Sequence, residues 1–237
     1  MDLKIYTDKQ TVAEEFSKFF SQQVKDSNEF HVSLSGGSTP KIVFDFLAEN
    51  YADDIDWSSV YLYWGDERCV SPDDEDSNYK MTKAHLLSKI EMPAENIFRI
   101  KGENDPETEA KRYSEVLKKQ LPIVDGLPQF DLVILGMGDD GHTASIFPYE
   151  IVLWDAEAYC AVATHPESGQ KRVGLTGGII NNAKTVAFLV TGADKAEKVE
   201  EIIGQRSGYK KYPASKVSPK SGELLWFLDR KAAAGLE

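Results

Sequence analysis

The fold is decided by residues 30–50, which have the sequence FHVSLSGGSTPKIVFDFLAEN. The apolar run 30–34 predicts a strand, and a helix is predicted to extend to about Asn50. Two glycines between them allow a tight turn. Thr39 is predicted as the helix N-cap, with Pro40 at the first helical position, where proline is tolerated. A strand that leads through glycines into a helix is typical of α/β proteins with a parallel sheet.

The same unit recurs along the chain. The apolar run 130–135 ends at Gly136, and 185–191 leads through Gly192 towards a helix. Periodicity predicts further strands and helices, namely strands at 3–6, 60–64, 158–164, 171–176 and 224–229 and helices at 8–25, 78–89, 106–120 and 193–203. Residues 65–77 are predicted to be a polar loop.

This alternation predicts an α/β fold, a mostly parallel sheet with helices on both faces. We expect a single domain over residues 1–231, with 140–175 as a candidate excursion from the sheet. Residues 232–237 (AAAGLE) are a candidate cloning remnant and are expected to contribute neither to the fold nor to the site. Asp8 or Thr11 is expected to cap the first helix.

Composition limits the classes of ligand. The chain has 237 residues, 41% hydrophobic and 28% charged, which is ordinary for a folded globular protein. Its net charge of −12 argues against nucleic acid and anionic membranes as partners. An anionic small molecule would need a few basic residues gathered at one place.

The cysteines and the N-terminus point to a cytoplasmic protein. Cys69 and Cys160 do not form a close-spaced metal pattern, so we expect a reducing compartment. Residues 1–11 are polar and show no signal peptide. No apolar run approaches the ~20 residues needed to cross a bilayer.

Ligands of open parallel sheets bind outside the carboxyl ends of the strands, so the loops there are the candidate site. In the first loop, Gly36 and Gly37 let the backbone approach an anion, while Ser38 and Thr39 add hydroxyl groups beside a helix start. The same residues are equally compatible with a tight turn and a helix cap. Their spacing matches no nucleotide-binding motif, so no nucleotide cofactor is expected.

A second loop, GMGDDGHT at 136–143, places Asp140 and His142 at a strand end. Histidine suits the role of general base. A surface histidine with Asp140 as a helix cap is the alternative. Whether Asp139 or Asp140 faces the site, and whether Asp140 contacts His142, stays open.

Charged residues complete the candidate set. Asp66, Glu67 and Arg68 follow another predicted strand, where they could also form a solvated, salt-bridged loop end. Arg172 and Lys195 are the basic candidates. Lys195 is expected in the first turn of its helix, where the helix dipole disfavours a cation unless an anion lies between them.

Taken in order, these loops resemble those of the 6-phosphogluconolactonase branch of the glucosamine-6-phosphate deaminase superfamily. The matching segments span nearly the whole chain and are SLSGGSTP at 33–40, YWGDERCV at 63–70, DSNY at 76–79, FDLVILGMGDDGHTASIFP at 130–148, RVGLT at 172–176 and LVTGADKAE at 189–197. The resemblance implies a modified Rossmann-like sandwich. It also implies hydrolysis of 6-phosphoglucono-δ-lactone to 6-phosphogluconate in the oxidative pentose phosphate pathway.

The resemblance also implies roles for individual residues. The expected phosphate ligands are Gly36, Gly37, Ser38, Thr39, Arg172 and Lys195. The expected contacts to the sugar ring are Asp66, Glu67, Arg68 and Asn78. His142 is expected to activate water, and Arg68 is expected to stabilise the oxyanion. Asp140 is expected to orient His142 or a neighbouring hydroxyl.

One departure separates this chain from the deaminase branch, which carries a glutamate where this sequence has Phe147. That difference favours lactone hydrolysis. An amino-sugar phosphate deaminase or isomerase and a non-catalytic sugar-phosphate sensor are the alternatives. We expect no metal and no organic cofactor, a phosphorylated sugar lactone as the small-molecule partner, and a monomer or weak homodimer.

Overall fold

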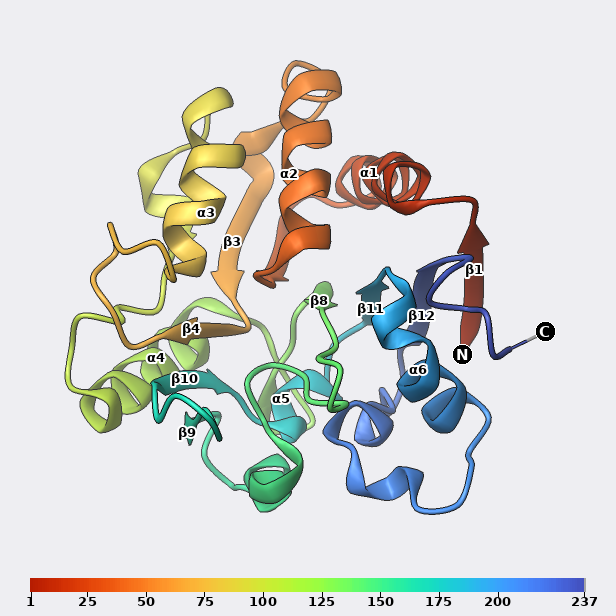
Figure 1. Ribbon diagram of the computed structural model, residues 1–237. Helices are drawn as coiled ribbons and strands as arrows, with labels where there is room; N and C mark the ends of the chain where they lie inside the picture. Colours follow the sequence, from red (N-terminus) through yellow and green to blue (C-terminus); the bar gives the residue numbers. More distant parts are fainter. Residues whose placement is uncertain (237) are drawn as a thin grey trace.

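A seven-stranded sheet, parallel at every neighbouring pair, forms the centre of the molecule (Figure 1). The computed structural model describes residues 1–236. The strand order is β1-β12-β11-β8-β2-β3-β5. The strands are β1 (Asp2–Tyr6), β2 (Phe30–Leu34), β3 (Val60–Trp64), β5 (Ile97–Phe98), β8 (Leu132–Leu135), β11 (Thr185–Val190) and β12 (Glu223–Asp229). The predicted α/β fold with a mostly parallel sheet is confirmed.

Helices pack against this sheet on both sides. They are α1 (Lys9–Lys25), α2 (Ser38–Asn50), α3 (Asn78–His85), α4 (Pro106–Gln120), α5 (Gly177–Ile180) and α6 (Ala196–Ile203). The chain crosses the sheet in one direction from β1 to β5 and returns in the other from β8 to β12. Because parallel crossovers are right-handed, α1 to α3 lie on one face and α4 to α6 on the other, as Figure 1 shows. Strands β2, β8 and β11 are buried along their whole length because both faces are covered.

The direction of travel reverses between two neighbouring strands, β2 and β8. The connection after β2 leads to one side of the sheet and the connection after β8 to the other. A reversal of this kind leaves a crevice at the carboxyl ends of the two strands, where α/β proteins bind their ligands.

A small antiparallel sheet corrects one prediction. Strand β4 (Asp66–Arg68) pairs with β10 (Lys171–Leu175), which pairs in turn with β9 (Cys160–Thr164). The prediction of a loop throughout 65–77 was wrong for the first residues of that segment. Three residues are too few to show an alternating pattern, and their partner strand lies far along the chain. Two further short strands, β6 (Ile123–Val124) and β7 (Leu127–Pro128), form a hairpin.

Three helix boundaries also differ from the predictions. Helix α2 is capped by Gly37 rather than Thr39, so Pro40 is its third residue instead of its first. Helix α3 ends before 3₁₀ turn Leu87–Lys89. Helix α6 follows 3₁₀ turn Ala193–Lys195, so Lys195 precedes the α-helix. The last two differences are 3₁₀ turns at helix ends, which hydrophobic periodicity does not predict.

The two ends of the chain join the same core. Asp8, one of the two expected caps, accepts hydrogen bonds from the first backbone N–H groups of α1. Phe16 of α1 packs edge-on against Phe227 of β12, with ring centroids 5.1 Å apart. Ala232 and Ala233, at the start of the candidate cloning remnant 232–237, are buried in the core. Glu237 lies outside the described residues.

One buried hydroxyl ties α4 to the end of β3. The hydroxyl of Tyr113 accepts a hydrogen bond from the Trp64 backbone N–H at 2.9 Å. It donates towards the carbonyl oxygens of Trp64 and Phe98, at 3.1 and 3.2 Å. Tyr113 is fully buried, so no water can replace these partners.

We therefore expect Tyr113→Phe to lower the free energy of unfolding by about 1–3 kcal/mol, because the Trp64 N–H is left unpaired in the core. Urea denaturation followed by tryptophan fluorescence measures this. Tyr61→Phe is the control, since Tyr61 is half-buried and its hydroxyl makes no hydrogen bond within residues 1–236. Equal stability of the two variants would contradict the prediction.

Candidate active site

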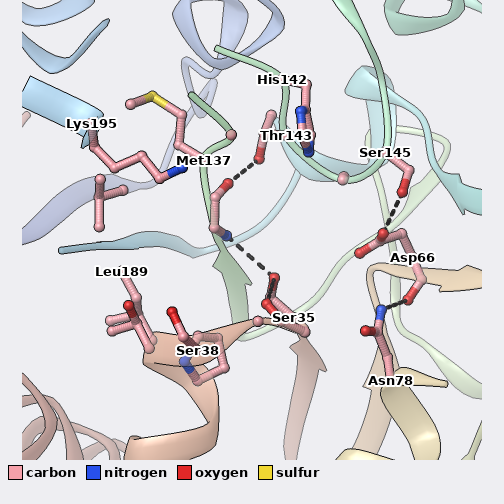
Figure 2. A pocket seen from close by; sticks show the side chains of 18 of the residues that line it. Ser35, Ser38, Asp66, Asn78, Met137, His142, Thr143, Ser145, Leu189 and Lys195 are labelled. Carbon is pink, nitrogen blue, oxygen red and sulfur yellow. Dashed lines mark hydrogen bonds between the residues drawn. The ribbon is translucent and has the colours of Figure 1, made fainter. Parts of the chain in front are cut away.

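A cavity of about 220 Å³ lies at the carboxyl ends of the central strands (Figure 2). The loops that follow β2, β8 and β11 contribute to its wall, together with β4 and β10. Of the predicted site residues, those that line it are Gly36, Gly37, Ser38, Thr39, Asp66, Arg68, Asn78, His142, Arg172 and Lys195. Glu67 and Asp140 are not part of the wall.

The first glycine loop is packed closely against α3. A Cβ atom on Gly36 would lie 1.9 Å from Oδ1 of Asn78, so only glycine fits beneath this amide. The Asn78 amide donates in turn to the Asp66 carbonyl oxygen at 2.9 Å. On the other side of the loop, the hydroxyls of Thr39 and Thr191 lie 2.8 Å apart and join α2 to the end of β11. The loop is therefore fixed in place at the start of α2.

The second glycine loop holds an Asp–His pair. The Asp140 carboxylate oxygen Oδ1 lies 2.6 Å from Nδ1 of His142 and accepts from the His142 backbone N–H at 3.0 Å. A Cβ atom on Gly138 would lie 2.2 Å from the same Nδ1, so the imidazole folds back over glycine backbone. Asp139 is exposed. Asp140 is therefore the carboxylate that contacts the histidine.

This contact fixes the chemistry of the imidazole. With Nδ1–H donating to Asp140, Nε2 is left as a proton acceptor. Burial alone raises the pKa of Asp140, but the hydrogen bonds and charge of His142 outweigh it, and this pKa lies below its usual value. Asp140 thus stays ionised and can stabilise a protonated His142.

Phe147 packs against the imidazole ring of His142. The ring centroids of Phe147 and His142 are 4.7 Å apart, and Phe147 is buried. The Arg172 guanidinium lies 5.7 Å from the centre of the same phenyl ring. A carboxylate at position 147 would stand beside the histidine, whereas the phenyl ring gives it an apolar neighbour.

Two arginines face each other across the small sheet. Arg68 of β4 pairs directly with Arg172 of β10, and Asp66 pairs with Gly174. Like charges at opposed positions are destabilising. Burial and the charge of Arg68 both lower the pKa of Arg172. The buried Nε atoms of both arginines find no partner within residues 1–236.

The remaining bonds of these arginines go to oxygen atoms. Arg68 donates through Nη1 to the Asp76 carbonyl oxygen at 2.6 Å, and Arg172 donates through Nη1 to the Ser145 hydroxyl at 3.3 Å. Because both guanidinium groups also line the cavity, they are suited to binding an anionic group there.

The cavity has two chemically different ends, which Figure 2 shows. Lys195 and Ser38 lie on one side, and Asp66 and Ser145 lie on the other. The sequence grouped Arg172 with Lys195. The structure places Arg172 beside Ser145 and Arg68, in the wall of the same cavity as Lys195. Lys195 forms an ion pair with Asp194, with 3.1 Å between Nζ and Oδ2.

Comparison with known proteins assigns the family. The family model described as glucosamine-6-phosphate isomerases/6-phosphogluconolactonase matches residues 8–226. The chain is 47% identical over 204 residues to a 6-phosphogluconolactonase of Aggregatibacter actinomycetemcomitans, covering 86% of each protein.

The chain belongs to the glucosamine-6-phosphate isomerase/6-phosphogluconolactonase family.

Solved structures agree with this assignment. The crystal structure of a devB protein superimposes with a TM-score of 0.95 at 44% identity, covering 100% of this chain and 99% of that one. The 6-phosphogluconolactonase of Trypanosoma brucei superimposes with a TM-score of 0.89 at 27% identity, covering 100% and 98%. The family resemblance expected from the sequence is confirmed.

Within residues 1–236, no helix is long and apolar enough for a membrane span. The same residues contain no group of three or more His, Cys, Asp or Glu side chains arranged to hold a metal ion.

Sequence reasoning did not predict four polar residues of this family member's cavity wall, namely Ser35, Thr143, Ser145 and Thr191. Ser145 is buried, has a positive φ of 58° and donates a short hydrogen bond to the carboxylate of Asp66. It follows Ala144, whose φ of 47° is also positive. Two consecutive non-glycine residues in this region are uncommon, and such backbone strain gathers at functional sites. The residue types in this segment do not predict such a backbone conformation.

Glu67, which was expected to contact the sugar ring, does not line the cavity. Strand alternation turns it away from Asp66 and Arg68, and it is buried. Its carboxylate accepts hydrogen bonds from the backbone N–H groups of Arg68, Asn78 and Tyr79 and from the Ser77 hydroxyl. Burial raises the pKa of Glu67, although the backbone hydrogen bonds oppose this. Glu67 therefore anchors the start of α3 and, through it, Asn78.

We expect Glu67→Gln to lower the free energy of unfolding by about 1–3 kcal/mol, because an amide NH₂ would meet N–H donors that now bond to oxygen. Thermal and urea denaturation measure this. Glu75→Gln is the control, since Glu75 is exposed on the same segment. Unchanged stability combined with weaker substrate binding would show instead that Glu67 contacts the substrate.

Proposed function

We propose that this protein hydrolyses 6-phosphoglucono-δ-lactone to 6-phosphogluconate with His142 as general base. The observation that carries the proposal is one cavity whose wall contains His142, oriented by Asp140, and two opposed arginines, Arg68 and Arg172. The 6-phosphogluconolactonase relatives, which match along most of their length, support the choice of substrate.

The phosphate group binds at the end of the cavity formed by Ser38, Thr39 and Lys195. The start of α2 supplies backbone N–H groups and the positive end of its dipole. Lys195 adds a full positive charge. This anchor holds the lactone ring in one orientation and so limits the motion of the reacting carbon.

The C1 carbonyl lies at the other end, between His142 and the arginines. Nε2 of His142 removes a proton from water as the water oxygen bonds to C1, and Asp140 stabilises the imidazolium that results. Arg68 and Arg172 stabilise the negative charge on the carbonyl oxygen. When the bond from C1 to the ring oxygen breaks, His142 returns the proton to that oxygen, and the open-chain acid is released.

The contacts of His142 also favour lactone hydrolysis over deamination. The carboxylate that touches it is Asp140, and Phe147 covers the imidazole where the deaminase branch has glutamate. A sensor would require the two opposed arginines but not the oriented imidazole. Turnover of the lactone distinguishes the enzyme from the sensor.

We expect His142→Ala to lower kcat by about 10²–10⁴-fold with little change in KM, because general-base assistance is lost while the phosphate anchor remains. The assay follows acid release from freshly prepared 6-phosphogluconolactone, corrected for spontaneous hydrolysis. His85→Ala is the control, since His85 lies at the far end of α3 and pairs with Asp45. A variant at position 142 with the kcat of the unmodified protein would remove His142 from the mechanism.

Substitution of the basic residues separates the two ends of the cavity. We expect Lys195→Ala to raise KM by about 10- to 100-fold through loss of a charge-assisted phosphate contact. Arg172→Ala should instead lower kcat by about 10²–10³-fold, as expected for an oxyanion donor. Lys184→Ala, which removes an exposed lysine, is the control. If Arg172→Ala changes only KM, then Arg172 is a phosphate ligand, as the family resemblance implied.

A further inference from the structure

A tyrosine from outside the family motifs lies directly behind the catalytic turn. Gly141, between Asp140 and His142, has a φ of +81°, and a Cβ atom there would lie 2.6 Å from Cδ1 of Tyr212. The backbone N–H of Ala214 donates to the Gly141 carbonyl oxygen at 3.1 Å. The ring of Tyr212 and the backbone beside it therefore form the surface against which the turn rests.

Tyr212 is itself held by groups that do not belong to the turn. It is 4% exposed, and its hydroxyl donates a short hydrogen bond to the Glu201 carboxylate on α6. The Nζ atoms of Lys198 and Lys211 lie 5.3 and 4.8 Å from its ring centroid. Cations at these distances over an aromatic ring attract it. The ring is thus fixed relative to α6 by contacts that do not involve the turn.

The turn needs an external support. Its own backbone hydrogen bonds run from Gly138 N–H to the His142 carbonyl and from Gly141 N–H to the Gly138 carbonyl, at 2.9 and 3.1 Å. Its glycines have the widest backbone freedom of any residue. Asp140 orients the imidazole but belongs to the same turn, so it moves with His142. The position of Nε2 in the cavity therefore depends on what the turn rests on.

We propose that Tyr212 is a positioning residue that holds the turn of His142 at its working distance from the substrate. The helix that holds Tyr212, α6, begins directly after Lys195, the residue assigned to the phosphate. One rigid element thus sets the place of the phosphate anchor and, through Tyr212, that of the base. This inference rests on the proposed function, because it requires that His142 perform the chemistry.

The test compares two substitutions of Tyr212. Tyr212→Leu removes the ring, and we expect kcat to fall by about 10- to 100-fold with KM within about threefold, since a displacement of ~1 Å costs rates of this order. Tyr212→Phe keeps the ring against Gly141 and should retain kcat within about threefold. Trp57→Leu, which removes a buried ring directly before the amino end of β3, should reduce stability without changing kcat.

A substitution on the other side of the contact covers the case in which Tyr212→Leu does not fold. Gly141→Ala places a methyl group 2.6 Å from the intact ring at a residue whose φ is +81°, so contact with the ring and backbone strain should together displace the turn and lower kcat. If either variant is folded at the assay temperature and keeps the kcat of the unmodified protein, the proposal is overturned. A loss of kcat in Tyr212→Phe as large as that in Tyr212→Leu would also overturn it, because the hydroxyl rather than the ring would then be responsible.

A double substitution tells the two proposals apart. If Tyr212 acts through His142, Tyr212→Leu should cost no further activity once His142 is alanine, so the two effects are not additive. Full additivity would contradict the positioning role while leaving the base role intact. Unchanged kcat in His142→Ala alone would refute the proposed function, whatever the result for the Tyr212 variants.

Discussion

The reversal of chain direction between β2 and β8 is the constraint on which the cavity depends. The two strands pair over only two positions, Val32 with Leu132 and Ser33 with Val133. Beyond that point their connections leave for opposite faces of the sheet. Near this opening, the Ser35 hydroxyl accepts a hydrogen bond from the Gly136 N–H at 3.3 Å. The first and second glycine loops are thus adjacent because of topology.

The small antiparallel sheet supplies a pair of opposed cations, which the loops of the parallel sheet do not supply. Loops at strand ends can present backbone N–H groups, but a pair of opposed cations requires two strands in register. The pairing of Arg68 with Arg172 provides this and turns Glu67 to the opposite side, where its carboxylate fastens α3. The repulsion between the arginines is a cost to stability that nearby carboxylates, chiefly Asp66, partly offset and that an anionic ligand would reduce further. Proteins accept such costs at functional sites.

The sequence predicted those parts of the molecule that depend on local pattern. Buried strands such as 185–191 show apolar runs, and their glycine loops follow them directly, so the fold and the loops at its edge could be foreseen. Arg172 and Tyr212 could not be placed, because their neighbours lie far along the chain. Glu67 could not be placed, because the pairing of β4 with β10 sets the side of the strand on which it lies. Ser145 was missed for a different reason, since its importance lies in a backbone conformation that side-chain types do not reveal.

The electrostatics of the whole chain explain why the cationic groups are recessed. A net charge of −12 repels a phosphorylated substrate at long range. At physiological ionic strength, however, exposed charges are screened beyond ~8 Å, whereas groups inside a cavity are screened much less. Attraction therefore has to come from short charge-assisted hydrogen bonds, which require partly buried donors held in place. Arg172 and Lys195 both line the cavity and are only partly exposed, which meets this requirement in a way that fully exposed lysines on an acidic protein cannot.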